Sequence, residues 1–166
     1  MAEDLGLRLE GKRVLVTSAV DRWGMTEGFF RAGCEVAACD LIFALGIPIP
    51  LRTRTALERT IRMVAPVAVT LPFSWLYEAD ADHETEVKDR SRYARLYQEA
   101  DIIAGDYKYV RRYMPADMRG TWVVTNTTTP EDVEFLRDRG VDLLVTSTPR
   151  LEGRTFGTNV IEATMV

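Results

Sequence analysis

The stretch Val14–Gly24, VLVTSAVDRWG, decides the fold class of this chain. A short apolar strand runs into a polar turn, and the residues after the turn have a helical pattern that ends at Gly33. Strand–turn–helix units of this kind open dinucleotide-binding domains, whose turn usually carries G-x-G-x-x-G. Here the turn from Ser18 to Gly24 contains a single glycine. The stretch therefore predicts the first unit of a nucleotide-binding fold in which the usual phosphate-binding turn is altered.

Apolar runs alternate with helical or capped segments along the rest of the chain. After the first strand, further strands are expected at 34–40, 67–71, 100–106, 121–128 and 141–148. Helices are expected at 55–64 with Thr55 as cap and Pro66 as stop, along the stripe from Tyr93 to Ala100, at 107–114, at 130–139 behind a Thr129 cap, and from 156 onward. Several strands are apolar throughout, as expected where helices cover both faces of a parallel sheet. The pattern predicts one α/β domain over residues 1–166, with a Rossmann-like, doubly wound and mostly parallel sheet and helices on both faces.

Composition narrows the function classes. The 166 residues carry a net charge of −4, with a pI of about 5.1, which argues against broad binding to nucleic acid. No apolar run approaches the roughly 18 residues that span a bilayer, and the acidic N-terminus has no signal-peptide core, so a cytoplasmic location without membrane contact is expected. Cys34 and Cys39 fall on opposite faces of one predicted strand, which favours two core thiols over a disulfide or a metal site.

Ligands of a doubly wound sheet bind at the carboxyl ends of its strands, so the residues there are the candidate site. Small hydroxyl and amide side chains recur at these ends and could form a polar rim for a small-molecule ligand. The same residue types also cap helices and turns, which is the alternative for each cluster. The candidate cofactor-binding residues are Thr17, Ser18, Ala19, Arg22, Asp40, Thr125, Asn126 and Thr127.

Asp40 and Arg22 have the most specific expected roles. Asp40 follows the first turn by about 20 residues, the spacing at which a carboxylate binds the ribose of an adenosine, although it could equally cap a turn. Arg22 and the amides near Gly24 could hold one phosphate. Arg52 and Arg54 could meet a 2′-phosphate, which Asp40 would repel, so NAD is favoured over NADP as the cofactor.

Two further groups could carry chemistry. Asp106 and Lys108 are ionisable residues at one strand end and are candidates for proton transfer; the alternative is a capping aspartate beside a solvated lysine. Arg150, Arg154 and Asn159 could bind a phosphate or carboxylate near a helix start, or could belong to an ordinary surface loop.

The chain also resembles a known group of proteins. The segment Leu7–Val36 is similar to the start of the cofactor domain of shikimate and quinate 5-dehydrogenases. More specifically, Ser18–Met25, Phe43–Arg52, Gly105–Pro115 and Thr125–Asn159 resemble bacterial proteins labelled quinate 5-dehydrogenase. This resemblance implies an NAD(P)-dependent oxidoreductase acting on a CH–OH group. In that family the catalytic lysine and aspartate belong to a separate N-terminal domain, so this chain would be the C-terminal half of a longer protein and would lack the full catalytic machinery.

Two functions are therefore expected, and they differ in class. The first is the NAD(P)-binding domain of a quinate- or shikimate-type dehydrogenase-like protein. The second is a non-catalytic ligand-binding or regulatory domain that recognises a small anionic metabolite, which the missing glycines favour. A distinct chemistry at Asp106 and Lys108 is a third alternative. The sequence also leaves open assembly into a homo-oligomer.

Overall fold

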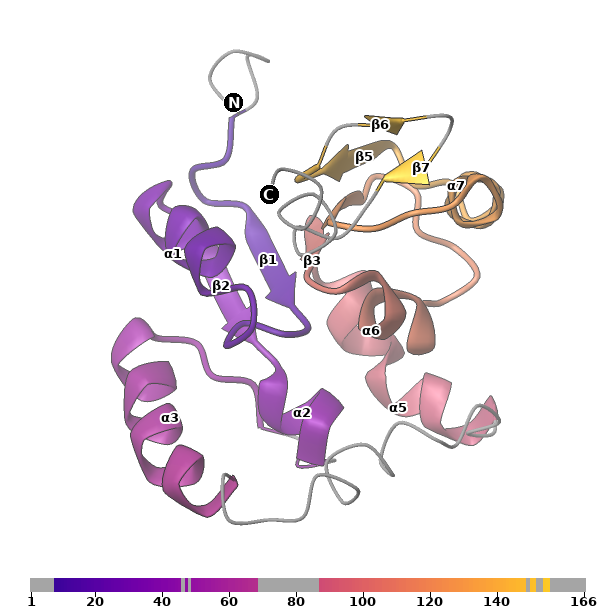
Figure 1. Ribbon diagram of the computed structural model, residues 1–166. Coiled ribbons are helices and arrows are strands. Elements are labelled where there is room, and N and C mark those ends of the chain that lie inside the picture. The colour runs from indigo at the N-terminus through magenta and orange to yellow at the C-terminus, as the bar shows by residue number, and fades with distance from the viewer. Residues whose placement is uncertain are drawn as a thin grey trace.

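Five parallel strands form the centre of the fold (Figure 1). The computed structural model describes residues 8–45, 47, 49–68, 87–148, 150–151 and 154–155. The strands of the sheet are β1 Arg13–Val16, β2 Glu35–Ala38, β3 Ile102–Ala104, β4 Trp122–Thr125 and β5 Leu143–Thr146. Their order across the sheet is β2-β1-β3-β4-β5, and every neighbouring pair is parallel. The expected α/β, Rossmann-like fold class is confirmed.

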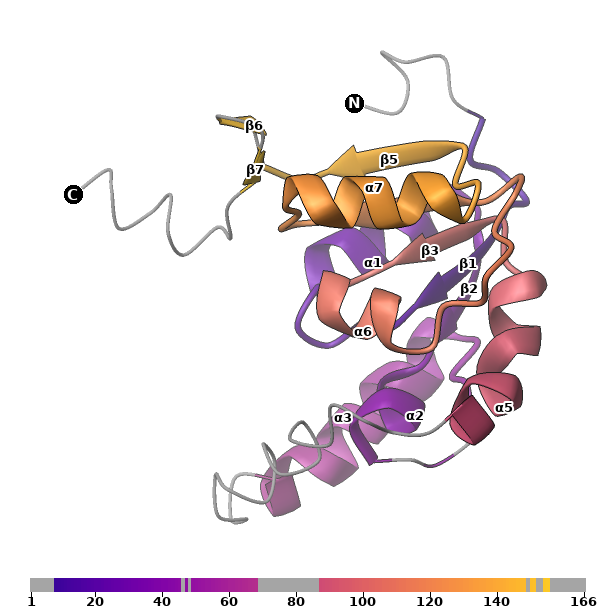
Figure 2. The same cartoon turned by 90° about the vertical axis from the view of Figure 1, so that its right-hand side faces the viewer.

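Helices cover both faces of this sheet. They are α1 Trp23–Arg31, α2 Asp40–Leu45, α3 Arg54–Ala68, α5 Val87–Gln98, α6 Tyr107–Arg112 and α7 Pro130–Asp138. Side chains of α1 and α3 pack on one face, whereas those of α2, α5, α6 and α7 pack on the other. Figure 2 shows α6 and α7 on the near side of the sheet and α1 on the far side. Among the described helices, none combines the length and the apolar character needed to cross a membrane.

The alternation of side chains along the strands divides the core into two clusters. Val14, Val16 and Ile102 belong to the cluster under α1 and α3, while Leu15 and Ile103 belong to the cluster under the other helices. The two cysteines follow the same division, with Cys34 in the first cluster and Cys39 in the second. Both thiols are free and buried, as their expected positions on opposite faces predict.

The best-defined helix is the one whose ends the sequence marks most clearly. Thr129 caps α7 by accepting a hydrogen bond from the Asp132 amide, and the Asp132 carboxylate accepts one from the Thr129 amide in return. Pro130 occupies the first helical position, where a missing N–H costs nothing. Gly140 follows the helix with φ +75°, a conformation that other residues rarely adopt. The predicted capped helix at 130–139 is confirmed.

The strand predicted at 67–71 is wrong where it can be compared. Val67 and Ala68 lie in α3, which continues past Pro66 instead of stopping before it; residues 69–71 lie outside the described part. The proline removes one backbone hydrogen bond near the end of the helix, and Leu57 and Ile61 hold the helix on the sheet by packing into the core. The outer edge of β2 is instead covered by Leu51, which forms an antiparallel bridge with Ala38.

Two predicted boundaries also move. Helix α3 begins at Arg54, and the Thr53 hydroxyl accepts a hydrogen bond from the Ala56 amide, so Thr53 rather than Thr55 is the cap. Asp40 was expected to end the second strand, but β2 ends at Ala38 and Asp40 begins α2. The reason is local, because a carboxylate suits the positive end of a helix better than the interior of a strand.

A short hairpin follows the sheet. Its strands, β6 Arg150–Leu151 and β7 Arg154–Thr155, pair in antiparallel orientation. The side chain of Thr155 connects this hairpin to the loop after β4, because its hydroxyl accepts a hydrogen bond from the Thr128 amide at 2.7 Å. The final helix predicted from residue 156 onward lies outside the described residues.

Candidate functional site

The loops that follow β1 and β3 meet at the carboxyl edge of the sheet. These two strands are neighbours, and the helices that follow them, α1 and α6, pack on opposite faces. This reversal is the topological switch point, where open α/β sheets bind their ligands. β1 and β3 are the first and the fourth of the strands predicted from the sequence. The order of the strands therefore brings the loops 17–22 and 105–106 together.

Gly105 makes this meeting possible. Its φ is +136°, and a Cβ at this position would collide with Thr17 Oγ1 and lie 3.1 Å from Ser18 Oγ. The Thr17 hydroxyl donates to the Ala104 carbonyl, and Ser18 Oγ accepts a hydrogen bond from the Asp106 amide at 3.0 Å. Both hydroxyl side chains are buried. Thr17 and Ser18, expected to bind cofactor, thus fasten the two loops to each other.

Arg22 extends across the switch point from the start of α1. Its Nη2 lies 3.4 Å from Asp106 Oδ2, and the arginine side chain is 26% exposed. Its Nε is buried, and no atom of the described residues accepts a hydrogen bond from it. Asp106 in turn caps α6, because its carboxylate accepts a hydrogen bond from the Lys108 amide at 3.0 Å. The capping interpretation of Asp106 is confirmed.

The first turn of α1 is suited to an anion. No side chain caps its amides, and it contains no acidic residue. The amides at the start of a helix lack intrahelical partners and carry the positive end of the helix dipole. A Cβ added at Gly24 would meet nothing within 4 Å, so the surroundings of this turn are open. Ala19 contributes through its backbone, since its side chain is fully buried and its carbonyl accepts a hydrogen bond from Thr26.

Asp40 contacts the loop between β1 and α1. Its Oδ1 accepts a hydrogen bond from the Val20 amide at 2.9 Å, while Oδ2 is buried without a partner in the described residues. Burial raises the pKa of the Asp40 carboxyl; hydrogen bonds from the amides of Val20 and Ala19 oppose this rise, and the nearby charge of Asp21 adds to it. Asp40 therefore holds the turn in place with one oxygen and keeps the other unpaired.

The loop after β4 reaches the same edge through hydroxyl and amide groups. The Thr125 hydroxyl donates to the Gly105 carbonyl at 2.9 Å, and the Asn126 carbonyl accepts from the Thr148 hydroxyl at 3.0 Å. Thr125 and Asn126 are buried, whereas Thr127 is exposed. The Thr125 side chain and the main-chain carbonyl of Asn126 thus join neighbouring loops. Sequence and structure agree on their position, and the hydrogen bonds assign Thr125 to loop packing.

With the geometry established, comparison with known proteins adds one result. The sequence model of a family described as Domain of unknown function (DUF8754) matches residues 1–166. The chain belongs to this family. No curated protein and no solved structure gives a significant match.

The remaining candidate site residues of this DUF8754 family member are Lys108, Arg150, Arg154 and Asn159. Lys108 is exposed on α6. Arg150 and Arg154, expected either near a helix start or in a surface loop, lie on the β6–β7 hairpin, with Arg150 opposite Thr155 and Arg154 opposite Leu151. Only their backbone is described, and Asn159 lies outside the described residues.

The sequence did not predict that Gly105 shapes the candidate site. Gly105 was noted only as part of a strand end, although its close contact with Thr17 sets the distance between the two loops of this DUF8754 domain. A glycine between an apolar strand and a capping aspartate, as in Ala104-Gly105-Asp106, is the available signal. The contact joins positions 88 residues apart, so nothing local in the sequence identifies its partner.

Proposed function

We propose that this chain is the nucleotide-binding domain of a dehydrogenase-like protein and that it takes NAD at the carboxyl edge of β1 and β2. The observation that carries the proposal is a pair of buried, unsatisfied atoms beside one turn. Among the residues that the structure describes, nothing accepts a hydrogen bond from Arg22 Nε and nothing donates one to Asp40 Oδ2. A ligand that offers a phosphate and a hydroxyl satisfies both, and a nucleotide has this combination.

The phosphate half of the proposal rests on Arg22 and α1. A guanidinium donates to Asp106 through one nitrogen and still has Nε for an anion. The uncapped first turn of α1 adds backbone amides beside it, and its lack of acidic side chains removes one source of repulsion. Charge-assisted hydrogen bonds of this kind are about twice as strong as neutral ones.

The ribose half rests on Asp40. An unpaired buried acceptor costs about 1–3 kcal/mol, which a ribose hydroxyl would recover by donating to Oδ2. A 2′-phosphate would instead bring a second negative charge to this carboxylate. Of the two arginines considered for this phosphate, Arg54 already pairs with Glu27 at 3.3 Å and with Glu58 at 2.9 Å. The other, Arg52, lines a hollow with Leu96 and Glu99. These contacts favour NAD over NADP.

The altered turn limits how the pyrophosphate is held. In the glycine-rich motif, backbone amides of the turn approach both phosphates. Here the Val20 amide donates to Asp40, and the Val20 side chain is 43% exposed at the same turn. Contact with one phosphate through Arg22 and α1 is therefore the proposed mode. Catalysis is not assigned to this chain, because the dehydrogenase resemblance places the reacting side chains in another domain.

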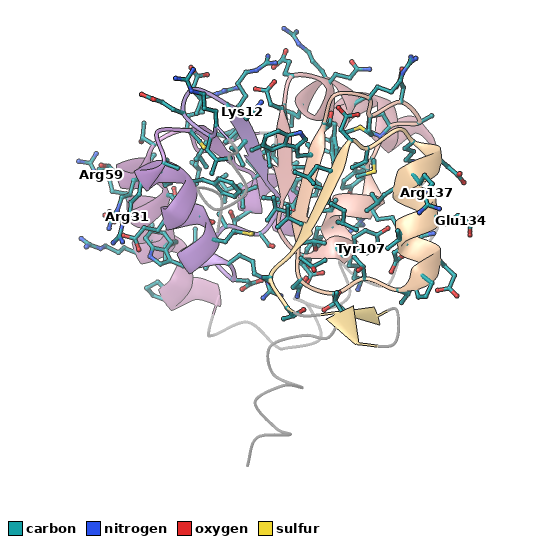
Figure 3. The ribbon with its side chains drawn as sticks, turned by 90° about the horizontal axis from the view of Figure 1, so that it is seen from above. Lys12, Arg31, Arg59, Tyr107, Glu134 and Arg137 are labelled. Carbon is teal, nitrogen blue, oxygen red and sulfur yellow. The ribbon has the colours of Figure 1, made fainter. Side chains whose placement is uncertain are left out.

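Calorimetric titration of adenosine, AMP, NAD and NADP tests the two halves separately. Arg22→Gln is expected to weaken AMP and NAD about tenfold, the effect of losing one charged hydrogen bond, and to leave adenosine unchanged. Asp40→Asn keeps an acceptor for Val20 but should weaken adenosine, AMP and NAD, whose ribose hydroxyl donates to Oδ2. NADP should not be weakened, because the substitution also removes the charge that repels its 2′-phosphate. Arg59→Ala is the matched control, because this arginine is exposed on α3 at the outer surface of the molecule (Figure 3), and the variant should bind as the parent chain does. Absence of heat with NAD at millimolar concentration, together with no competition by ADP, would refute the proposal.

A second candidate is a non-catalytic domain for a small anionic metabolite. The observation that favours it is the engagement of the Val20 amide by Asp40, which leaves less backbone for a pyrophosphate. In this case inorganic phosphate should bind at Arg22 as well as AMP does, and adenosine should not bind. An Arg150→Ala, Arg154→Ala double variant that binds phosphate unchanged would exclude the hairpin arginines from this site.

A further inference from the structure

A hollow of about 350 Å³ lies away from the switch point, between the 50–52 segment and α5. Ile42, Pro50 and Leu96 form an apolar part of its wall, and Tyr93 contributes an aromatic ring. A smaller hollow of about 60 Å³ continues from it over Ala37 and Ala100. Arg52, Leu96 and Glu99 line both, so the two hollows form one groove beside β2. Its size is within the range of small-molecule sites.

The groove exists because the residues beneath it are small. Ala37 on β2 and Ala100 before β3 face the cluster packed under α5, and their methyl groups leave space that a larger side chain would fill. The segment that bounds the other side is held in place by backbone hydrogen bonds between Leu51 and Ala38, at 2.8 and 2.9 Å. Sheet pairing thus fixes Arg52, the next residue, at the wall of the groove.

Within the described part of the chain, the groove has one arginine that forms no ion pair, although its charge helps to lower the pKa of Glu99. Arg95 pairs with Glu99 at 2.6 Å, and Arg13 pairs with Asp101 at 3.3 Å. The pKa of Glu99 lies below its usual value, chiefly because of the hydrogen bond from Arg95. Arg52 makes no ion pair within the part of the chain that the structure describes. The larger hollow, lined by Arg52, Arg95 and Glu99, therefore carries one net positive charge.

We propose that this groove binds a small carboxylate with an apolar ring, whose carboxylate pairs with Arg52 and whose ring packs between Leu96, Ile42 and Pro50. A guanidinium presents two parallel N–H groups that match the two oxygens of a carboxylate. The apolar wall requires a hydrophobic body, which distinguishes this ligand class from inorganic anions. The residues that line this groove do not include Arg22 or Asp40, on which the proposed nucleotide site rests.

Nuclear magnetic resonance with benzoate as the probe tests this assignment. Benzoate is expected to shift the amide signals of Leu96 and Glu99, while neutral benzamide and inorganic phosphate leave them in place. Arg52→Ala should raise the benzoate dissociation constant about tenfold, and Leu96→Trp should abolish binding by filling the hollow without removing a charge. Arg59→Ala removes an exposed arginine elsewhere and should bind benzoate as the parent chain does.

Three results would overturn the proposal. One is the absence of shifts with millimolar benzoate, and another is an Arg52→Ala variant that binds benzoate as tightly as the parent chain. The third is an equal shift of the Leu96 and Glu99 amide signals with phosphate and with benzoate, which would mean that the groove responds to any anion and does not recognise the ring. Titration with NAD in the same samples keeps the two sites distinct, since its shifts are expected near Arg22 and not near Leu96.

Discussion

Gly105 and Thr17 approach each other so closely that no side chain fits at position 105. The backbone there has φ +136°, so a substitution meets two obstacles, the strained dihedral and the Thr17 hydroxyl. The contact closes the switch point between β1 and β3. It explains why the two loops can exchange hydrogen bonds through Ser18 and Asp106.

Gly105→Ala should therefore destabilise the chain strongly. A residue with a Cβ pays roughly 1–2 kcal/mol to adopt a positive φ. The clash of the added methyl group with Thr17 adds roughly 1–3 kcal/mol. Urea unfolding should show a loss of at least about 2 kcal/mol. Gly24→Ala is the matched control, because its Cβ meets nothing and it lies in a helix, where alanine is favoured by roughly 0.5–1 kcal/mol. Equal stability of the two variants would contradict the close contact.

Thr129→Ala should weaken the α7 cap. The substitution removes the hydroxyl that accepts from the Asp132 amide, and lost caps of this kind cost about 1 kcal/mol. Thr127→Ala removes an exposed threonine two residues earlier and should change the free energy of unfolding by less than about 0.5 kcal/mol. A chemical-denaturation comparison of the two variants measures the difference. If Thr127→Ala costs as much as Thr129→Ala, the cap is not the source of the effect.

Asp40 should give the chain a specific dependence of stability on pH. Burial raises its pKa in the folded state, so the folded chain holds this proton more tightly than the unfolded chain. As pH rises from the unfolded value of about 3.9 through the raised folded value, the folded state loses stability relative to the unfolded state.

The measurement is the difference in unfolding free energy between the parent chain and Asp40→Asn over this range. The difference should shift against the parent chain as pH increases and should become constant above the folded pKa. Glu99 and Asp101 have pKa values below their usual values, so their contributions to stability change with pH in the opposite direction. The parent chain and the variant both contain these residues, so their contributions cancel in the difference. A constant difference across acidic pH would contradict the burial of the carboxylate.

The two cysteines should react slowly with thiol reagents while the chain is folded. Burial raises the pKa of Cys39 to about 12, and it also raises the pKa of Cys34, so little thiolate exists near neutral pH. At pH 8, Cys39 should react with a disulfide reagent only when the whole chain unfolds, so its rate of modification should depend on global unfolding. Urea should accelerate it steeply, and Cys39→Ser should remove the slower of two kinetic phases. Rapid labelling of both thiols in the absence of urea would disagree with their packing.

Local patterns were sufficient to predict most of the fold. The runs that became β1, β3, β4 and β5 are apolar because both faces of the sheet are covered, and this pattern is visible without tertiary information. Thr129, Pro130 and Gly140 marked the ends of α7 in the same way. The strand predicted at 67–71 failed because its β-branched residues resemble a strand, while the packing of Leu57 and Ile61 extends the helix into it.

The candidate site was predictable in position but not in its contacts. The sequence predicted that Ser18, Arg22 and Asp40 follow the carboxyl ends of two strands, and the structure places them after β1 and β2. The partners of these residues are set by approaches between distant segments, such as the 88 positions that separate Ser18 from Asp106. Hydrogen-bond partners at such separations depend on the packed sheet, so residue type alone could not tell a ligand contact from a loop contact.

The bridge between Leu51 and Ala38 also reduces the free edge that β2 can present to another chain. An edge strand exposes a row of backbone groups that can recruit another chain and begin a fibril. Because backbone groups of alternate residues point to the same side, Leu51 occupies those of Ala38 and leaves only Val36 of β2 available at this edge. A single residue outside the sheet thus halves the template that β2 could offer to aggregation.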